Sequence, residues 1–520
     1  MASRSFSSSS RANDDANALD IPASIDQVIE LAADNWNDAR SVATRLRQNK
    51  GILVSSQEIK TVAVYHWQIG CGGADEVARS QIKTLSKLGY KVVAITDNPI
   101  PPTALMELGF PVSCVLRSFE ELDEDSYEVR ARAFEACLVD NNVDALIYNQ
   151  WMSNTALWEL LIAKMHGIPT VVCMHGVFVF PLTDLENSWI GARLTELPET
   201  LSLADAIICG SETDRVFWGA RNPNVFLTRY KSPFVPDESQ TPSASSDVGV
   251  ACLSEETPPD HQNEPRIVWV GRLSIEKRAL DAIEIFALVK AKIPGAVLDM
   301  VGPYDETWHD AVVQRASQLG VSDSVVLHGM QNDVSPFYRN ASLFLHTSST
   351  ESYCLSLFEA KSWGLPCVMY ELPFLELAKR GERGGVVAVP HRNVDAAADA
   401  CIRILSDPEL HAALGTASRM DMKPFLEFDD AEFWASVMSS LAIKRDLPPL
   451  NEKNQLIEEA FRITYDNAID DVSGKIALLE SQLQETRARL NEVETSTTFK
   501  VGRMIMALPT RIKDAVTTRR

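Results

Sequence analysis

The chain has 520 residues, of which 45% are hydrophobic and 23% are charged, and this composition is typical of a globular protein with a sizeable core. Its length favours two to four domains rather than one. The formal net charge of −22 argues against a nucleic-acid partner, because a general nucleic-acid-binding protein needs a basic face.

The cysteines and histidines show no spacing typical of a structural metal site. The nine cysteines lie in apolar segments without paired spacing, so we interpret them as reduced core thiols of a cytosolic protein. The nine histidines show no metal-binding spacing either. The chain has no apolar signal region and no run of ~18 apolar residues, which predicts a cytoplasmic protein without a membrane span.

The first 60 residues are predicted to form a disordered start and a helical preface. Residues 1–20 are rich in Ser, Asn and Asp, a composition that disfavours a packed core. Apolar residues then recur with a helical period over 25–47. The sequence does not indicate what this preface does.

Residues 61–236 are predicted to form a first Rossmann-like domain. Helical stretches such as 78–88 and 156–165 lie between short apolar strands at 61–65, 91–95, 144–148, 170–174 and 205–209. Such alternation predicts a parallel sheet with helices on both faces.

Two features of this domain follow its strands. Gly72 and Gly73 lie in a turn between the first strand and a helix, where glycine lets the backbone approach a ligand closely. This turn is not the GxGxxG fingerprint of nicotinamide-binding domains. His175 follows the strand at 170–174, which places it at the ligand-binding edge of the sheet, although a lone histidine is more often structural.

Residues 237–264 are rich in Pro, Ser, Asp and Glu and are predicted to be a linker or insertion. A second alternating series over 265–424 predicts another Rossmann-like domain, with strands at 267–271, 297–301, 325–327, 343–345, 367–370 and 386–389. Two such domains in series create a cleft between them.

Two cations follow the first strand of the second domain. Arg272 and Lys277 lie where open α/β sheets bind their ligands, and their side chains suit phosphate oxygens. The alternative is a surface cluster at a helix start, which we prefer for Arg278.

Two carboxylates with seven residues between them follow the fourth strand of this domain. Glu351 lies in a polar loop, and Glu359 lies within the following helix. Backbone N–H groups around Tyr353, Cys354 and Leu355 would point out of the helix start and form an anion site suited to phosphate. A phosphate site flanked by hydroxyl-binding carboxylates indicates a nucleotide sugar as ligand.

The C-terminal part of the chain departs from this alternation. An amphipathic helix is predicted within 425–450, followed by a helical extension over 451–495. A heptad seam over 472–493 predicts a coiled-coil homodimer, with a single packed helix as the alternative. The tail at 496–520 interleaves basic and apolar residues, which predicts peripheral contact with anionic lipid or, alternatively, a solvated basic end.

These motifs resemble the GT-B glycosyltransferases of the family 4 type. The resemblance extends over about 61–445 and is carried by Gly271, Arg272 and Lys277, followed by the Glu351 and Glu359 pair. Strand-then-glycine segments ending at Gly302 and Gly329 also match. Cys354 stands where the family often has glycine, and the tail is similar to tails of bacterial cell-surface polysaccharide glycosyltransferases.

The resemblance implies an α/β protein of the GT-B fold, with two Rossmann-like domains facing across a cleft, a helix that crosses back, and a C-terminal helical or coiled-coil extension. It implies transfer of a sugar, with retained configuration, from a nucleoside-diphosphate sugar to a glycan or lipid-linked acceptor in cell-surface polysaccharide or glycoconjugate synthesis. A nucleotide-sugar epimerase and a catalytically silent scaffold are the alternatives. The carboxylate pair together with His175 favours the transferase.

The resemblance also implies roles for the candidate residues. The catalytic candidates are His175, which would contact the transferred sugar, and Glu351, which would hold a sugar hydroxyl. Arg272 and Lys277 would stabilise the leaving diphosphate, and Glu359 would hold the ribose. The donor-binding candidates are Gly72, Gly73, Arg272, Lys277, Tyr353, Cys354, Leu355 and Glu359. No metal or other cofactor is expected, because no Asp-x-Asp motif lies at a suitable strand end.

Overall fold

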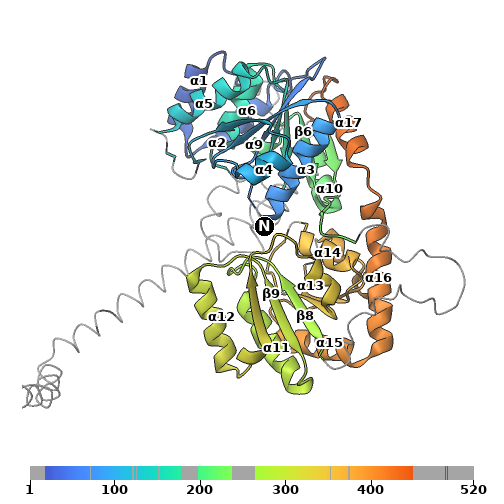
Figure 1. The fold of residues 1–520 in the computed structure, drawn as a ribbon. Helices are drawn as coiled ribbons and strands as arrows, with labels where there is room; N and C mark the ends of the chain where they lie inside the picture. The colour runs from blue at the N-terminus through green and yellow to red at the C-terminus, as the bar shows by residue number, and fades with distance from the viewer. Residues whose placement is uncertain are drawn as a thin grey trace, which may run out of the picture.

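The computed structural model describes residues 18–448, except 71, 120–121, 124–125, 150–152, 177–196, 237–263, 352 and 373–374, and it also describes residues 487 and 489. Two parallel sheets with covering helices form two α/β domains, one above the other in Figure 1. The predicted fold of two Rossmann-like domains is confirmed. The predicted seam at 472–493, apart from 487 and 489, and the tail at 496–520 lie outside the described residues.

The first domain contains a seven-stranded sheet in the order β3-β2-β1-β4-β5-β6-β7. Its strands are β1 Thr61–Tyr65, β2 Lys91–Thr96, β3 Val112–Val115, β4 Ala145–Tyr148, β5 Thr170–Cys173, β6 Ala206–Cys209 and β7 Val225–Leu227. Its described helices are α3 Gly73–Lys87, α4 Pro102–Glu107, α5 Tyr127–Asp140, α6 Ala156–Met165, α9 Leu197–Leu201 and α10 Glu212–Gly219. Every residue of β1, β4, β5 and β6 is buried, because helices cover both faces of the sheet.

The two edge strands of this sheet, β3 and β7, were not predicted from the sequence. Val112 and Val115 of β3 are exposed, and β7 has only three residues, all partly exposed. Neither strand therefore shows the continuous apolar run by which the buried strands were recognised.

The helical preface is part of the first domain. The expected helix over 25–47 is divided into α1 (Ile25–Asn35) and α2 (Ala39–Arg47), because the Asp38 carboxylate caps the start of α2 by accepting a hydrogen bond from the Ser41 N–H. Helix α1 packs on α5 and α6, and α2 packs on α9. Val28 and Leu46 thus belong to the same hydrophobic core as β1.

A buried polar network fixes the end of β2 in this domain. The Arg130 guanidinium donates hydrogen bonds to Asp97 (2.9 Å), to Glu159 (2.6 Å) and to the hydroxyl of Tyr65 (2.7 Å). Asp97 follows β2, where dinucleotide-binding domains use an acidic residue for the ribose. Here the Asp97 side chain pairs with a buried cation, so it has a structural role.

The second domain contains a six-stranded sheet in the order β10-β9-β8-β11-β12-β13. Its strands are β8 Arg266–Val270, β9 Val297–Val301, β10 Val325–Gly329, β11 Leu343–His346, β12 Cys367–Tyr370 and β13 Val386–Val389. Its helices are α11 Ala279–Lys292, α12 Glu306–Gln318, η4 Ser322–Ser324, α13 Ser335–Asn340, α14 Leu355–Ser362, η5 Glu376–Ala378, η6 Gly381–Gly384, α15 Val394–Ser406 and α16 Pro408–Leu426. All six strands predicted for this domain are present, three with the predicted ends and three with ends that differ by one or two residues.

The chain then returns to the first domain through α17 (Asp430–Ser440). Helix α16 packs on α14 of the second domain, whereas α17 packs on α3 of the first, and Figure 1 shows the two helices along one side of the molecule. Trp434 and Val437 of α17 are buried in one core with Val62 of β1. The helix expected within 425–450 is present as α17, and a turn follows it at 441–442.

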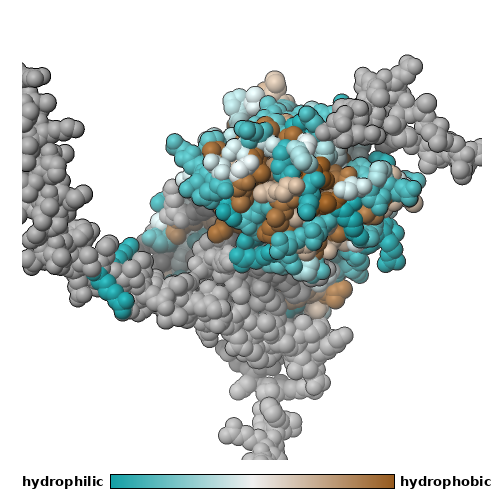
Figure 2. Space-filling view, turned by 90° about the horizontal axis from the view of Figure 1, so that it is seen from below, coloured by the Kyte–Doolittle hydropathy of each residue, from teal (hydrophilic) through white to brown (hydrophobic). Residues whose placement is uncertain are grey.

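The described surface shows no sign of a membrane-spanning segment. None of the described helices combines the length and apolar character that a bilayer crossing requires. Seen from the side of the second domain, hydrophilic and hydrophobic residues are interspersed (Figure 2), as on the surfaces of globular proteins.

Glycines end neighbouring strands of the second sheet and bring the backbones into close contact. The Gly271 N–H donates to the Val301 carbonyl, and the Gly302 N–H donates to the Gly329 carbonyl, both over 2.9 Å. Gly302 has a φ of +145°, and a Cβ added there would lie 2.0 Å from the Gly271 oxygen. Only glycine fits this position.

We therefore expect Gly302→Ala to destabilise the protein by at least about 2 kcal/mol, because the new methyl group would overlap the Gly271 carbonyl. Gly320→Ala is the matched control, since Gly320 also has a positive φ (+68°) but nothing lies within 4 Å of an added Cβ. Its cost should be about 1 kcal/mol. Thermal unfolding of both variants measures the difference, and equal Tm values would contradict the close approach.

Candidate functional site

The C-terminal edges of the two sheets face each other. A Cβ placed on Gly73, in the first turn of α3, would lie 3.6 Å from Cδ1 of Leu355 in the second domain. A Cβ on Gly210, which follows β6, would lie 3.3 Å from the Tyr353 ring. Figure 1 shows α14 directly below α3 and α10. The structure thus brings the candidates Gly73, Tyr353 and Leu355 together across the domain boundary.

In each sheet the strand order reverses direction once, next to the first strand of the domain. β1 lies beside β4 in the first sheet, and β8 lies beside β11 in the second. Ligands of open α/β sheets bind in the crevice at such a reversal. The loops that follow these four strands therefore form the candidate site.

A buried carboxylate organises the glycine turn after β1. Asp75 accepts hydrogen bonds from the N–H groups of Gly72 (2.9 Å) and Gly70 (3.1 Å), and its other oxygen lies 2.9 Å from Nε2 of His66. Burial acts to raise the pKa of Asp75, but the hydrogen bonds from His66 and the two N–H groups outweigh it and lower the pKa. Asp75 and His66 were not among the predicted site residues, although an acidic residue in the first turn of a helix is a signal for such a cap.

His175 lies at the end of β5 and is neutral. Its Nε2 is 2.8 Å from Oδ1 of Asn149, which follows β4, and its ring stacks on Tyr230 with centroids 6.0 Å apart. Burial, together with the nearby His66, lowers the pKa of His175 to about 3. The Asn149 oxygen also accepts a hydrogen bond from Gln81 (3.1 Å), so the tautomer that fits carries its proton on Nε2. His175 is therefore neutral near pH 7, with Nδ1 able to accept a hydrogen bond.

A cluster of charges joins the loops after β8 and β11. Nζ of Lys277 lies 2.5 Å from Oε1 of Glu351, which is also 3.2 Å from Nε2 of His346. The Ser348 hydroxyl donates to the same oxygen over 2.9 Å. Burial alone would raise the pKa of Glu351, but Lys277 and His346 outweigh it and hold the pKa well below its usual range. Glu351 is therefore ionised, with a cation on either side.

Glu351 in turn raises the pKa values of its two cationic partners, Lys277 and His346. Burial disfavours the charged form of Lys277, but the attraction of Glu351 outweighs it and raises the pKa of Lys277. Burial likewise acts to lower the pKa of His346, but Cys354 and Glu351 raise it to about 9. His346 was not predicted as a site residue, because it ends a buried apolar strand and no spacing motif links it to Glu351.

The structure does not place Arg272 in this cluster. Its side chain is 68% exposed and pairs with Glu276 over 3.2 Å. Arg278 pairs with Asp281 over 2.8 Å at the start of α11, but only 15% of its side chain is exposed, so it is not part of an open surface cluster. Of the two predicted diphosphate cations, only Lys277 contacts one of the carboxylates.

Glu359 lies in a different environment from Glu351. It is buried within α14, where it accepts hydrogen bonds from the hydroxyls of Ser232 (2.5 Å) and Tyr338 (2.6 Å). Burial raises the pKa of Glu359 to about 7, and the two neutral donors only partly oppose this. No sequence motif linked Ser232 or Tyr338 to Glu359, because the three residues lie far apart in the chain.

Cys354 takes the backbone conformation of a glycine at the start of α14. Its φ of 66° and ψ of 75° are left-handed, a region that favours glycine. Its Sγ lies 3.6 Å from Nε2 of His346 and 3.6 Å from the Ser356 hydroxyl. The neighbouring Tyr353 ring packs edge-on against Tyr230, with centroids 5.1 Å apart.

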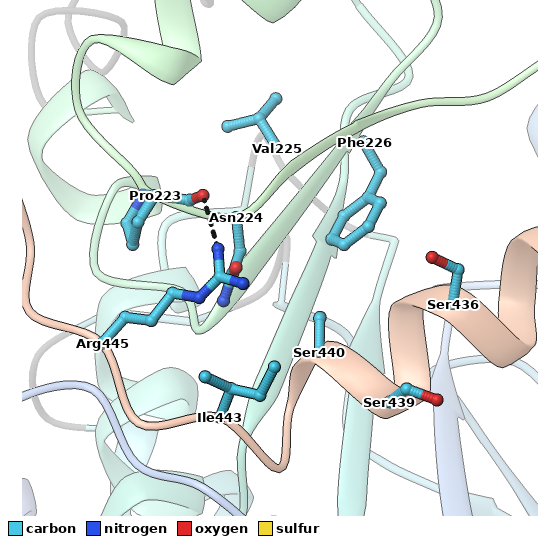
Figure 3. A pocket seen from close by; sticks show the side chains of 9 residues that line it. All are labelled: Pro223, Asn224, Val225, Phe226, Ser436, Ser439, Ser440, Ile443 and Arg445. Carbon is cyan, nitrogen blue, oxygen red and sulfur yellow. Dashed lines mark hydrogen bonds between the residues drawn. The ribbon is translucent and has the colours of Figure 1, made fainter.

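A separate pocket of about 390 Å³ lies between β7 and α17. Figure 3 shows its side chains, with Arg445 donating to the Pro223 carbonyl over 3.3 Å. Pro223 and Asn224 precede β7, so this pocket lies toward the opposite sheet edge from the candidate site. It contains none of the candidate residues.

Two family models match the chain. The model described as Glycosyl transferase 4-like domain matches residues 72–217, and the one described as Glycosyl transferases group 1 matches residues 255–421. The first match falls within the first domain, and the second covers the end of the linker and most of the second domain. Together they include every candidate site residue.

Known proteins agree with these models. N-acetyl-alpha-D-glucosaminyl L-malate synthase of Bacillus anthracis is 27% identical over 159 residues, which are 30% of this chain and 40% of that protein. D-inositol 3-phosphate glycosyltransferase of Gordonia bronchialis is 25% identical over 334 residues, 59% of this chain and 69% of that protein. The chain therefore spans less than half of the first relative's length.

A solved structure shows the same fold. HepE of Anabaena, in complex with UDP and glucose, superposes with a TM-score of 0.56 at 16% identity, covering 74% of this chain and 100% of that one. Sheet order, family models and fold agree, and the chain belongs to the GT-B glycosyltransferases of the family 4 type.

Proposed function

We propose that this protein transfers a sugar from a nucleoside-diphosphate sugar to a glycan or lipid-linked acceptor, with retained anomeric configuration, in the synthesis of a cell-surface polysaccharide or glycoconjugate. The observation that carries the proposal is the cluster of Lys277, Glu351 and His346 at the strand-order reversal of the second sheet. HepE, which has the same fold, is described in complex with UDP and glucose, and this supports a nucleoside-diphosphate donor.

The cations would act on the leaving group. Negative charge grows on the diphosphate as its bond to the sugar breaks, and preorganised cations stabilise that charge. Lys277 is held at the site by Glu351, and the exposed Arg272 can turn from Glu276 toward a bound ligand. Each charge-assisted hydrogen bond contributes about 1.5–3 kcal/mol. With the N–H groups at the start of α14, these cations would take the role that a metal ion has in other transferases.

The two carboxylates would hold hydroxyl groups. Glu351 is ionised and can accept a hydrogen bond from a hydroxyl of the donor sugar. Glu359 would accept from the ribose, and its two present donors, Ser232 and Tyr338, leave each oxygen a further lone pair.

His175 fits a contact with the transferred sugar better than a role as general base. A pKa of about 3 lies too far below neutral pH for effective proton abstraction. Its unprotonated Nδ1 would instead accept a hydrogen bond from a sugar hydroxyl. His175 would therefore position the sugar and would not remove a proton.

We expect Arg272→Ala and Lys277→Ala each to reduce kcat by at least about tenfold, because a lost charge-assisted contact in the transition state costs at least about 1.4 kcal/mol. Arg272 is exposed, so its variant should fold normally. Arg278→Ala is the control, since it removes an adjacent cation whose side chain pairs with Asp281 instead. Normal turnover in both Arg272→Ala and Lys277→Ala would refute the assignment.

Nucleoside diphosphate binding should strengthen as the pH rises between about 6 and 8. The pKa of Glu359 is raised to about 7, so the carboxylate that accepts ribose hydroxyls forms over this interval. Glu359→Gln should bind about tenfold more weakly at the upper pH and show a smaller pH dependence. Calorimetry measures the affinity of both proteins over this pH range. The ionisation of the ligand's own phosphate affects both proteins equally, so the difference between them reports on Glu359. Parallel pH profiles would place Glu359 away from the ribose.

We further propose a peripheral position on the inner face of a membrane. The tail at 496–520 carries six basic residues against one aspartate, on a chain whose net charge is −22. Each basic residue near an anionic surface contributes about 1 kcal/mol, and a coiled-coil dimer through 472–493 would place two tails on one surface.

The full chain should therefore co-sediment with anionic but not with neutral liposomes, and less so at high salt. Truncation after Val493 should abolish this binding, whereas Leu479→Asp with Leu483→Asp, which keeps the tail but disrupts the seam, should weaken it. Equal sedimentation of the full and truncated proteins would exclude the tail as an anchor.

A further inference from the structure

Three potential metal ligands lie together between the end of β11 and the start of α14. Nε2 of His346, a carboxylate oxygen of Glu351 and Sγ of Cys354 are all within 4.8 Å of one another. Nε2 is 3.2 Å from Oε1 of Glu351 and 3.6 Å from Sγ. Tetrahedral Zn²⁺, with bonds of about 2.0–2.3 Å, separates such donor atoms by roughly 3.3–3.7 Å. The separation of 3.6 Å between Nε2 and Sγ falls within this range, and the separation of 3.2 Å between Nε2 and Oε1 lies just below it.

The ligand types favour one class of metal. A thiol and an imidazole suit Zn²⁺ and similar soft or borderline ions, whereas Mg²⁺ and Ca²⁺ prefer oxygen ligands alone. His346 and Cys354 are 3% and 6% exposed, so little water competes for them. The Ser348 hydroxyl donates to Glu351 and orients its carboxylate, as outer hydrogen bonds do in metal sites.

The backbone of Cys354 takes a conformation that would suit glycine better. Its left-handed conformation is unfavourable for any residue with a Cβ, and such residues persist where the surrounding structure holds them. The thiol is thereby directed toward His346. A glycine would fit the backbone better and would remove the third ligand, so this feature belongs to the particular sequence of this chain.

The ammonium group of Lys277 lies where a metal ion bound to Glu351 would lie. It lies 2.5 Å from the same Glu351 oxygen that faces His346. A divalent ion bound to that oxygen would repel the ammonium, and to bind the ion the protonated His346 and the Cys354 thiol would each release a proton. Metal and Lys277 therefore exclude each other. Displaced from Glu351, Lys277 would lose the contact that holds it at the sheet edge.

We propose that His346, Glu351 and Cys354 form a binding site for a thiophilic divalent cation such as Zn²⁺, and that its occupation displaces Lys277 and opposes nucleoside diphosphate binding. The site is regulatory and is compatible with metal-independent catalysis. Metal binding itself does not depend on the proposed function.

The test uses the full chain, freed of metal with EDTA and desalted, and Co²⁺ as a spectroscopic probe. Binding through Cys354 should produce a thiolate-to-cobalt charge-transfer band that saturates at one ion per chain and is bleached by Zn²⁺. Cys354→Gly suits the backbone at this position and should abolish the band, and His346→Gln should weaken cobalt binding by at least about tenfold. Cys401→Ala, which removes a buried thiol elsewhere in the domain, should leave the band unchanged.

The role of Lys277 has its own readout. Lys277→Gln should bind Zn²⁺ at least about tenfold more tightly, because the competing ammonium is gone. Calorimetry with Zn²⁺ alone measures this affinity, and Zn²⁺ should weaken nucleoside diphosphate binding in the parent protein but not in Cys354→Gly. Absence of the band, or its persistence in Cys354→Gly, would overturn the site. Unchanged Zn²⁺ affinity in Lys277→Gln would overturn the exclusion of Lys277.

Discussion

The site depends on one constraint, which is that all the strand pairings in both sheets are parallel and that each sheet reverses its strand order beside its first strand. Parallel strands end at one edge, so the loops after β1, β4, β8 and β11 converge there. The return of α17 onto the first domain, through Trp434 and Val437, attaches the end of the second domain to the first. The contacts of Tyr353 and Leu355 with the first domain follow from this arrangement.

Environment gives the two carboxylates opposite behaviour, although only seven residues separate them. Glu359 is buried and the Glu351 side chain is 11% exposed, and this loss of solvent acts to raise the pKa of each. Glu351 lies between Lys277 and His346, and their charges outweigh burial, so it stays ionised. Glu359 meets only the neutral hydroxyls of Ser232 and Tyr338, so its pKa rises to about 7. One site thus contains a fixed negative charge and a carboxyl group that titrates near neutral pH.

Much of the fold could be predicted from the sequence, because the buried strands are continuous apolar runs that alternate with helical periods. This pattern failed for β3, which is an exposed edge strand, and for β7, which has three residues. It also did not show that α1 and α2 pack into the first domain, since amphipathic helices do not specify the surface that covers their apolar face.

The sequence by itself determined which chemistry the chain carries: the strand-end glycines, the cations Arg272 and Lys277, and the Glu351 and Glu359 pair. Spacing along the chain is visible in a sequence, and it relates these residues to neighbouring strand ends. Only the tertiary structure decided their partners, which placed Lys277 on Glu351, left Arg272 exposed and brought His346 to Cys354. Those contacts depend on side-chain directions and burial set by packing between elements, and no local pattern in the sequence encodes them.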